Sequence, residues 1–178
     1  MIVQSQRFTL MQRLLHWVMA VCIVAMLFIG VGMVSTADWI YPTLLAWHRP
    51  IGALIFVLAL IRLVYRLRHP APPLPADMPG WQKLAAHGSH WLLYVTMIAM
   101  PLIGWSMQSA GGYPVRLTRW LVLPPIAPHD ILLYGFLRTA HTVVAYCFFA
   151  LILGHLAAAL FHALIRRDGV FESMAGGR

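Results

Sequence analysis

The sequence predicts an all-α membrane protein, a bundle of four transmembrane helices with both chain termini in the cytoplasm. Of the 178 residues, 61% are hydrophobic and only 10% are charged, too few to cover the surface of a soluble protein. Four apolar segments are each long enough to cross about 30 Å of hydrocarbon at about 1.5 Å per residue. The positive charge lies mostly at the ends of these segments, so we expect a single integral-membrane domain over residues 1–178 and no nucleic-acid binding.

The predicted spans cover about residues 11–34, 48–67, 81–108 and 138–165. A proline-rich stretch between the second and third spans favours an extended linker. Pro101 is expected to kink the third span. The longest connection, residues 109–137, is expected to cap one end of the bundle.

The distribution of lysine and arginine predicts the orientation. Nine of these residues fall on the side of the two termini and four on the other, which by the positive-inside rule places both termini in the cytoplasm. An even number of spans agrees with this. The nine are Arg7, Arg13, Arg62, Arg66, Arg68, Lys83, Arg166, Arg167 and Arg178, and the four are Arg49, Arg116, Arg119 and Arg138.

Histidines in the spans are the most informative residues. His141 and His155 are separated by 14 positions in the fourth span, which puts them on nearly one helix face and roughly 21 Å apart along the axis. His16 opens the first span near the cytoplasmic side, and His48 opens the second near the opposite side. Depth alone therefore pairs His16 with His155 and His48 with His141.

Two depth-matched pairs of histidines predict two bis-histidine haems. Any one of these residues taken alone could be an ordinary buried or interfacial histidine. Neutral imidazole is a good iron ligand, and two axial imidazoles leave no open position, which suits electron transfer. The sequence has no C-x-x-C-H motif, so we expect b-type haems, without thioether links.

Other histidines leave alternatives open. His87 and His90 lie at i and i+3 near the cytoplasmic start of the third span and compete with His16 for the inner iron. His162 lies seven residues beyond His155, roughly 10 Å nearer the cytoplasm, and is either a quinone contact and proton donor or a plain interfacial histidine.

Two arginines are expected beside the outer haem. Arg49 directly follows His48, and Arg138 precedes His141 by about one helical turn. The simpler role for both is to neutralise haem propionates through charge-assisted hydrogen bonds. The sharper role is to attract a small anionic electron donor, for which Arg116 and Arg119 are further candidates.

The order and spacing of several motifs resemble the bacterial dihaem cytochrome b561 family over essentially the whole chain. The motifs are Arg13-Leu-Leu-His16-Trp17, Trp47-His48-Arg-Pro-Ile-Gly52, Arg62-Leu-Val-Tyr-Arg66, Ala86-His87-Gly-Ser-His90, Ala140-His141-Thr and Gly154-His155-Leu-Ala-Ala-Ala-Leu-Phe-His162.

The resemblance implies an inner-membrane four-helix bundle with two b haems, held by His16, His48, His141 and His155, that exchanges electrons with ubiquinone. It also implies a superoxide oxidase as one function, with superoxide as the periplasmic donor. Two alternatives remain at this point. One is a haem-bearing anchor subunit of a dehydrogenase or hydrogenase, and the other is a haem-free transporter or proton channel with histidine relays.

Overall fold

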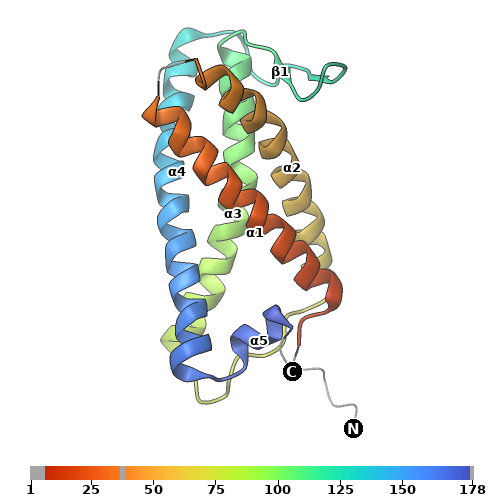
Figure 1. Cartoon of the computed structure of the whole chain (residues 1–178), viewed down its shortest axis with the longest axis vertical. Helices are drawn as coiled ribbons and strands as arrows, with labels where there is room; N and C mark the ends of the chain where they lie inside the picture. The colour runs from red at the N-terminus through yellow and green to blue at the C-terminus, as the bar shows by residue number, and fades with distance from the viewer. Residues whose placement is uncertain (1–6, 37–38, 177–178) are drawn as a thin grey trace.

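The structure, a computed structural model, describes residues 7–36 and 39–176 and is mostly helical (Figure 1). Four long helices form the bundle: α1 (Leu10–Ser35), α2 (Tyr41–Arg68), α3 (Gly80–Ala110) and α4 (Ile131–Leu160), the last extended by a π-helical segment, η1 (Phe161–Arg166). All four are apolar and long enough to cross a membrane. The four predicted spans are therefore confirmed as helices.

Two of these helices begin about two turns earlier than predicted. The second starts at Tyr41 instead of residue 48, and the fourth at Ile131 instead of residue 138. Pro42 fits the first turn of α2, where its missing N–H costs nothing. The carboxylate of Asp130 accepts hydrogen bonds from the first backbone N–H groups of α4. The predicted spans began at His48 and Arg138, whereas the apolar residues just before each of them also belong to the helix.

The helices pack in sequence around a small interior. Close backbone packing joins α1 to α2, α2 to α3 and α3 to α4, and Figure 1 shows α1 crossing in front of α3 at an angle. The buried cluster in the middle consists of Met19, Ala59, Tyr94 and Met97. Most other apolar side chains point outward, for example Val21 at 69% and Phe28 at 75% exposure. Such exposed apolar faces are stable in lipid and not in water.

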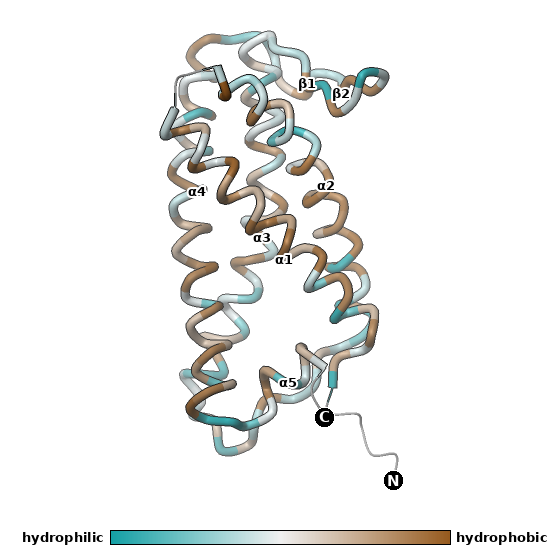
Figure 2. The backbone as a smooth tube through the Cα atoms, in the orientation of Figure 1, coloured by the Kyte–Doolittle hydropathy of each residue, from teal (hydrophilic) through white to brown (hydrophobic). Residues whose placement is uncertain are grey.

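Hydrophobic residues, drawn in brown in Figure 2, dominate the middle of the bundle, and both of its ends are more polar. At one end, called the terminal end, residues near both chain termini meet: the N–H of Phe8 donates to the carbonyl of Ser173 at 3.3 Å. The short helix α5 (Val170–Ala175) lies under the bundle here, after a turn in which Gly169 has φ +80°. Neither α5 nor the π-helical segment was predicted.

At the opposite end, called the loop end, the long connection forms a structured cap. It contains a two-stranded antiparallel hairpin, β1 (Val115–Arg116) and β2 (Val122–Leu123), that reaches sideways past α2 (Figure 1). The indole N–H of Trp105 donates to the carbonyl of Pro124, and the N–H of Asp130 donates to the carbonyl of Ala110. These bonds tie the cap to the end of α3.

Candidate functional site

Two pairs of histidine rings meet inside the bundle, one pair near each end. His16 of α1 and His155 of α4 form the terminal pair, with ring centres 6.2 Å apart. His48 of α2 and His141 of α4 form the loop pair, also with ring centres 6.2 Å apart. The structure thus brings together the residues that depth alone paired. Binding of iron by either pair remains a prediction.

Both pairs connect helices whose backbones do not pack closely. The terminal pair joins α1 to α4 and the loop pair joins α2 to α4, whereas close packing in the described residues joins only successive long helices of the bundle. Direct contact between two helices normally depends on small or interlocking side chains. Here imidazole rings connect the helices instead, which is the arrangement that a bundle uses to hold a group in its interior.

The ring separations fit one metal ion between the two imidazoles of each pair. A metal–imidazole bond is about 2.0 Å and the ring nitrogen lies about 1.1 Å from the ring centre, so rings on opposite sides of one iron have centres about 6.2 Å apart. No cluster of three or more His, Cys, Asp or Glu side chains that could hold a metal ion occurs in residues 7–36 and 39–176. Two protein ligands are what a haem iron needs, because the porphyrin supplies the other four.

The ring nitrogens also argue against a purely structural role. The Nδ1 atoms of His16 and His48 are buried and have no hydrogen-bond partner among the described residues. Buried polar atoms seldom remain unpaired in a native protein. Hydrogen bonds from Nδ1 to the described residues therefore do not explain why these rings are buried.

A third histidine lies beside the terminal pair. The ring centre of His90 is 5.4 Å from that of His155, so His90 does share this site, while His87 is exposed. The shorter separation leaves too little room for an iron between His90 and His155 in this arrangement. The geometry favours His16 as the partner of His155 and places His90 at the edge of the site.

Two features of α3 position the loop pair. A Cβ built at Gly104 would come 3.3 Å from Cε1 of His141, so the bare backbone of Gly104 makes room for that ring. Near the end of α3, the Oε1 atom of Gln108 accepts a hydrogen bond of 2.7 Å from Arg49. The sequence analysis did not connect Gly104 or Gln108 with the loop pair, because neither belongs to a motif.

The two arginines predicted beside the loop pair have different environments. Arg49 is partly buried, and its Nε atom is buried and lacks a partner among the described residues. Arg138 is exposed on α4. An orphaned guanidinium nitrogen is suited to holding a carboxylate, whereas an exposed one is suited to attracting a solute.

His162 belongs to a charged network at the terminal end. Its Nδ1 atom lies 2.8 Å from Oδ2 of Asp168, which also lies 3.1 Å from Nε of Arg166. Arg166 in turn contacts Asp77 of the linker at 2.6 Å. His162 lies within the π-helical segment, a kind of helix that often occurs at functional sites. The sequence did not reveal Asp168 as its partner.

A separate cavity of about 540 Å³ lies under the hairpin at the loop end. Residues from the end of α3, the hairpin and the segment before α4 line it, among them Ser109, Tyr113 and His129. None of the residues predicted to bind haem, quinone or the donor lines this cavity. This cavity is therefore separate from the two histidine pairs.

The fold and the histidine pairs together define an integral-membrane protein that holds paired imidazoles between helices. Residues 7–177 match the family described as prokaryotic cytochrome b561, and the chain belongs to that family. Membership implies binding of b-type haem and a role in electron transport. The structure and the family agree on a multi-pass membrane protein.

Three curated relatives are similar over most of their length. The chain is 28% identical to "Cytochrome b561 homolog 1" of Escherichia coli over 94% of this chain and 96% of the relative. It is 28% identical to "Cytochrome b561 homolog 2" of the same organism, over 96% and 92%. It is 31% identical to "Probable superoxide oxidase CybB" of Yersinia pestis, over 71% and 72%. The last name describes an oxidoreductase, which supports a redox role for this chain.

Proposed function

We propose that the protein is a dihaem cytochrome b of the bacterial inner membrane that transfers electrons from periplasmic superoxide to ubiquinone. The observation that carries this is the presence of two histidine pairs of equal ring separation near opposite ends of one bundle. The donor is proposed from the similarity to the probable superoxide oxidase. When bound, the two haems would supply one-electron carriers at two depths of the membrane.

Each residue of the pairs has a defined task in this proposal. His48 and His141 would hold the outer haem, and His16 and His155 the inner one. With two imidazoles each, the haems would supply electron transfer without an open position for the donor or dioxygen. Removing one electron from superoxide yields dioxygen without proton transfer, so the outer end needs no acid or base.

Arg49 and Arg138 would act at the donor side in different ways. Arg49, held by Gln108 and partly buried, is placed to hold a propionate of the outer haem. Arg138 is exposed and carries a positive charge close to the same haem along α4, so it would attract an anion from solution.

Quinone reduction needs two electrons and two protons, and the network at His162 is placed to supply protons. His162 is partly buried near the terminal end of α4, and its Nδ1 atom lies 2.8 Å from Oδ2 of Asp168. This contact would leave the other ring nitrogen available to a substrate. Two superoxide ions would deliver the two electrons, one at a time, and His162 would pass protons from the cytoplasm to the quinone.

The experiment is stopped-flow mixing of the purified, haem-loaded protein with superoxide, with and without a ubiquinone analogue. We expect rapid haem reduction, followed by reoxidation only when quinone is present. Superoxide dismutase added beforehand should abolish the signal, and the His141→Ala variant should show little of it. Haem that stays oxidised in fully loaded protein would contradict superoxide as donor.

A second function, an anchor subunit for a soluble redox enzyme, is favoured by the hairpin. Trp120 at its tip is 91% exposed, with Leu121 at 50% and Val122 at 48%. A partner protein would cover such an apolar surface. Isolation of a stoichiometric redox partner from the native membrane, lost when Trp120 is replaced by Ser, would favour this function over superoxide oxidation.

A further inference from the structure

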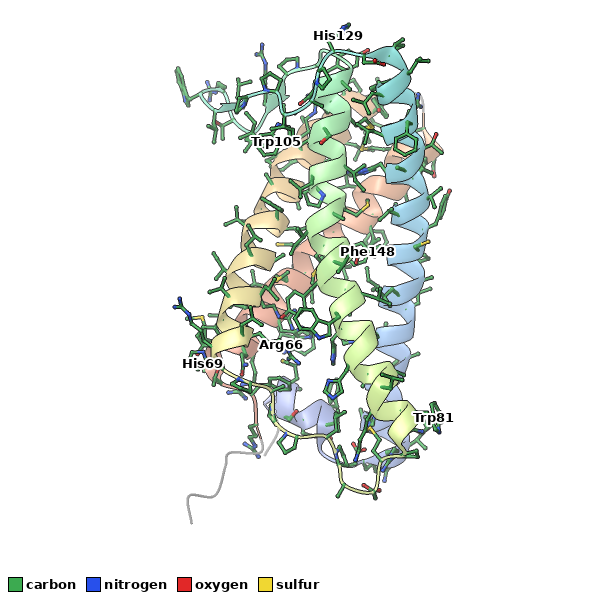
Figure 3. All side chains as sticks on the ribbon, turned by 180° about the vertical axis from the view of Figure 1, so that it is seen from behind. Arg66, His69, Trp81, Trp105, His129 and Phe148 are labelled. Atoms are coloured by element: carbon green, nitrogen blue, oxygen red, sulfur yellow. The ribbon has the colours of Figure 1, made fainter. Side chains whose placement is uncertain are left out.

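Two arginines at the terminal end of α2 have no acidic partner in the described part of the chain. Arg62 and Arg66 are one helical turn apart and partly buried, and Figure 3 shows Arg66 inside the lower part of the bundle, above α5. Within residues 7–36 and 39–176, neither guanidinium makes a hydrogen bond or an ion pair. A cation inside a membrane span is costly unless an anion pairs with it.

A buried tyrosine faces the same space. Tyr94 of α3 is 6% exposed, and its hydroxyl is buried without a partner in the described part of the chain. The guanidinium carbon of Arg62 lies 5.7 Å from the centre of the Tyr94 ring. A small, partly open cavity is lined by these three side chains together with Phe8, Gln12 and Met174. Two cations and one hydroxyl donor therefore converge on one cavity.

The described residues supply no carboxylate to this cavity. Asp77 and Asp168 contact Arg166, and Asp130 caps α4 at the other end of the bundle. Glu172 on α5 forms no ion pair with Arg62 or Arg66, and its Oε2 atom is itself unpaired. Among the described residues, no anion pairs with Arg62 or Arg66, so the cavity is suited to a bound carboxylate.

We propose that Arg62, Arg66 and Tyr94 form a carboxylate-binding site that receives the propionates of the inner haem. The cavity adjoins the terminal pair: Gln12 lies one helical turn before His16 on α1, and Tyr94 lies one turn after His90, whose ring centre is 5.4 Å from that of His155. A b-type haem carries two carboxylates on one edge. Guanidinium groups bind carboxylates through paired charge-assisted hydrogen bonds, and the tyrosine hydroxyl adds a further donor. This assignment rests on the proposed binding of a haem by His16 and His155.

The test uses purified holoprotein in nanodiscs and the variants Arg62→Gln, Arg66→Gln, Arg62→Lys and Tyr94→Phe. Arg68→Gln is the matched control, because Arg68 is on the same helix but exposed. Haem content, the reduction potential of each haem and the propionate bending band in resonance Raman spectra are measured for each variant. None of these requires turnover with superoxide or quinone.

We expect Arg62→Gln to shift the reduction equilibrium of the inner haem about tenfold toward the oxidised form, equivalent to about 59 mV for one electron, because a nearby cation stabilises the added electron. Arg66→Gln should have a smaller effect in the same direction. Arg62→Lys should keep most of the potential but change the propionate band, since a lysine cannot form the paired contact. Tyr94→Phe should change the band with little effect on the potential.

Unchanged potentials and unchanged propionate bands in Arg62→Gln and Tyr94→Phe proteins that contain both haems would overturn this assignment and leave the proposed function intact. Wild-type protein with no haem at the terminal pair would instead overturn the dihaem function. A potential that depends on added phosphate, with unaltered propionate bands, would show that the cavity holds a free anion and would also overturn the assignment.

Discussion

The imidazole ring of His141 lies against the bare backbone of Gly104, at a distance that leaves no room for an extra methyl group without movement. A Cβ at Gly104 would be 3.3 Å from Cε1 and 3.6 Å from Nδ1 of His141. Both atoms belong to a rigid ring, so the whole imidazole would have to move by a few tenths of an ångström. The position of the ring therefore depends on a glycine of the neighbouring helix.

Replacing Gly104 is accordingly expected to weaken haem binding at the loop pair. Gly104→Ala should shift the ring by a few tenths of an ångström and reduce occupancy of the outer haem in part, whereas Gly104→Leu should abolish it. Haem content per chain and the spectra of the two haems report this. Gly88→Ala is the control, since a Cβ at Gly88 of the same helix meets nothing within 4 Å. Full loading of the Leu variant would contradict the proposed position of the haem.

Wild-type protein should contain two b haems per chain, both low-spin with two imidazole ligands. His155→Ala should remove the inner haem only and His141→Ala the outer one only, because each ring belongs to a different pair. A pyridine haemochrome assay gives the number, and electron paramagnetic resonance gives the ligation. A single haem in the wild-type chain would refute the two-haem assignment.

His16 and His90 can be distinguished by the same measurements. Because the His16–His155 separation fits a shared iron and the His90–His155 separation is shorter, His16→Ala should lose the inner haem and His90→Ala should retain it. If His90→Ala loses the haem and His16→Ala keeps it, the ligands must be reassigned.

Arg49 and Arg138 should respond differently to substitution by glutamine. Arg138→Gln should retain both haems but be reduced by superoxide about 10-fold more slowly at low ionic strength, with the difference shrinking as salt is added. Arg49→Gln should lose outer haem, because its buried Nε and its bond to Gln108 indicate a holding role. Rates of stopped-flow reduction, normalised to haem content, separate the two effects. A wild-type rate that is insensitive to ionic strength would exclude electrostatic attraction of the donor.

Asp168→Asn should slow quinone reduction without affecting reduction of the haems by the donor. The carboxylate of Asp168 holds His162 and also contacts Arg166, so its loss would release the His162 ring. Asp77→Asn is the control, since Asp77 contacts Arg166 but not His162 and is 75% exposed. Haem reoxidation by a quinone analogue is the measurement. Equal reoxidation rates in the two variants would exclude a role for the His162–Asp168 pair.

Both termini are expected in the cytoplasm, because nine of the thirteen lysines and arginines lie on their side of the spans. A reporter fused after Arg178 should show cytoplasmic fluorescence and no alkaline phosphatase activity. The opposite result would make the loop pair the inner one and the terminal pair the outer one. The two histidines within each pair would stay the same.

The sequence by itself determined the number of membrane helices and the pairing of the histidines. Both depend on quantities that are local along the chain: the length of an apolar segment, and the depth of a residue within it. A helix rises by a fixed distance per residue, so His141 and His155 have defined depths before any packing is known. The paired rings of the structure follow that rule.

Only the tertiary structure decided which side chains surround these rings. Gly104 beside His141, Asp168 beside His162 and Tyr94 beside Arg62 are contacts between segments, or across a turn, that no spacing encodes. They depend on how the helices rotate and cross, and on the turn at Gly169 that brings α5 beneath the bundle. Packing against neighbouring helices sets the rotation of each helix. The lipid-facing side of a membrane helix is also apolar, so the sequence pattern reveals little about this rotation.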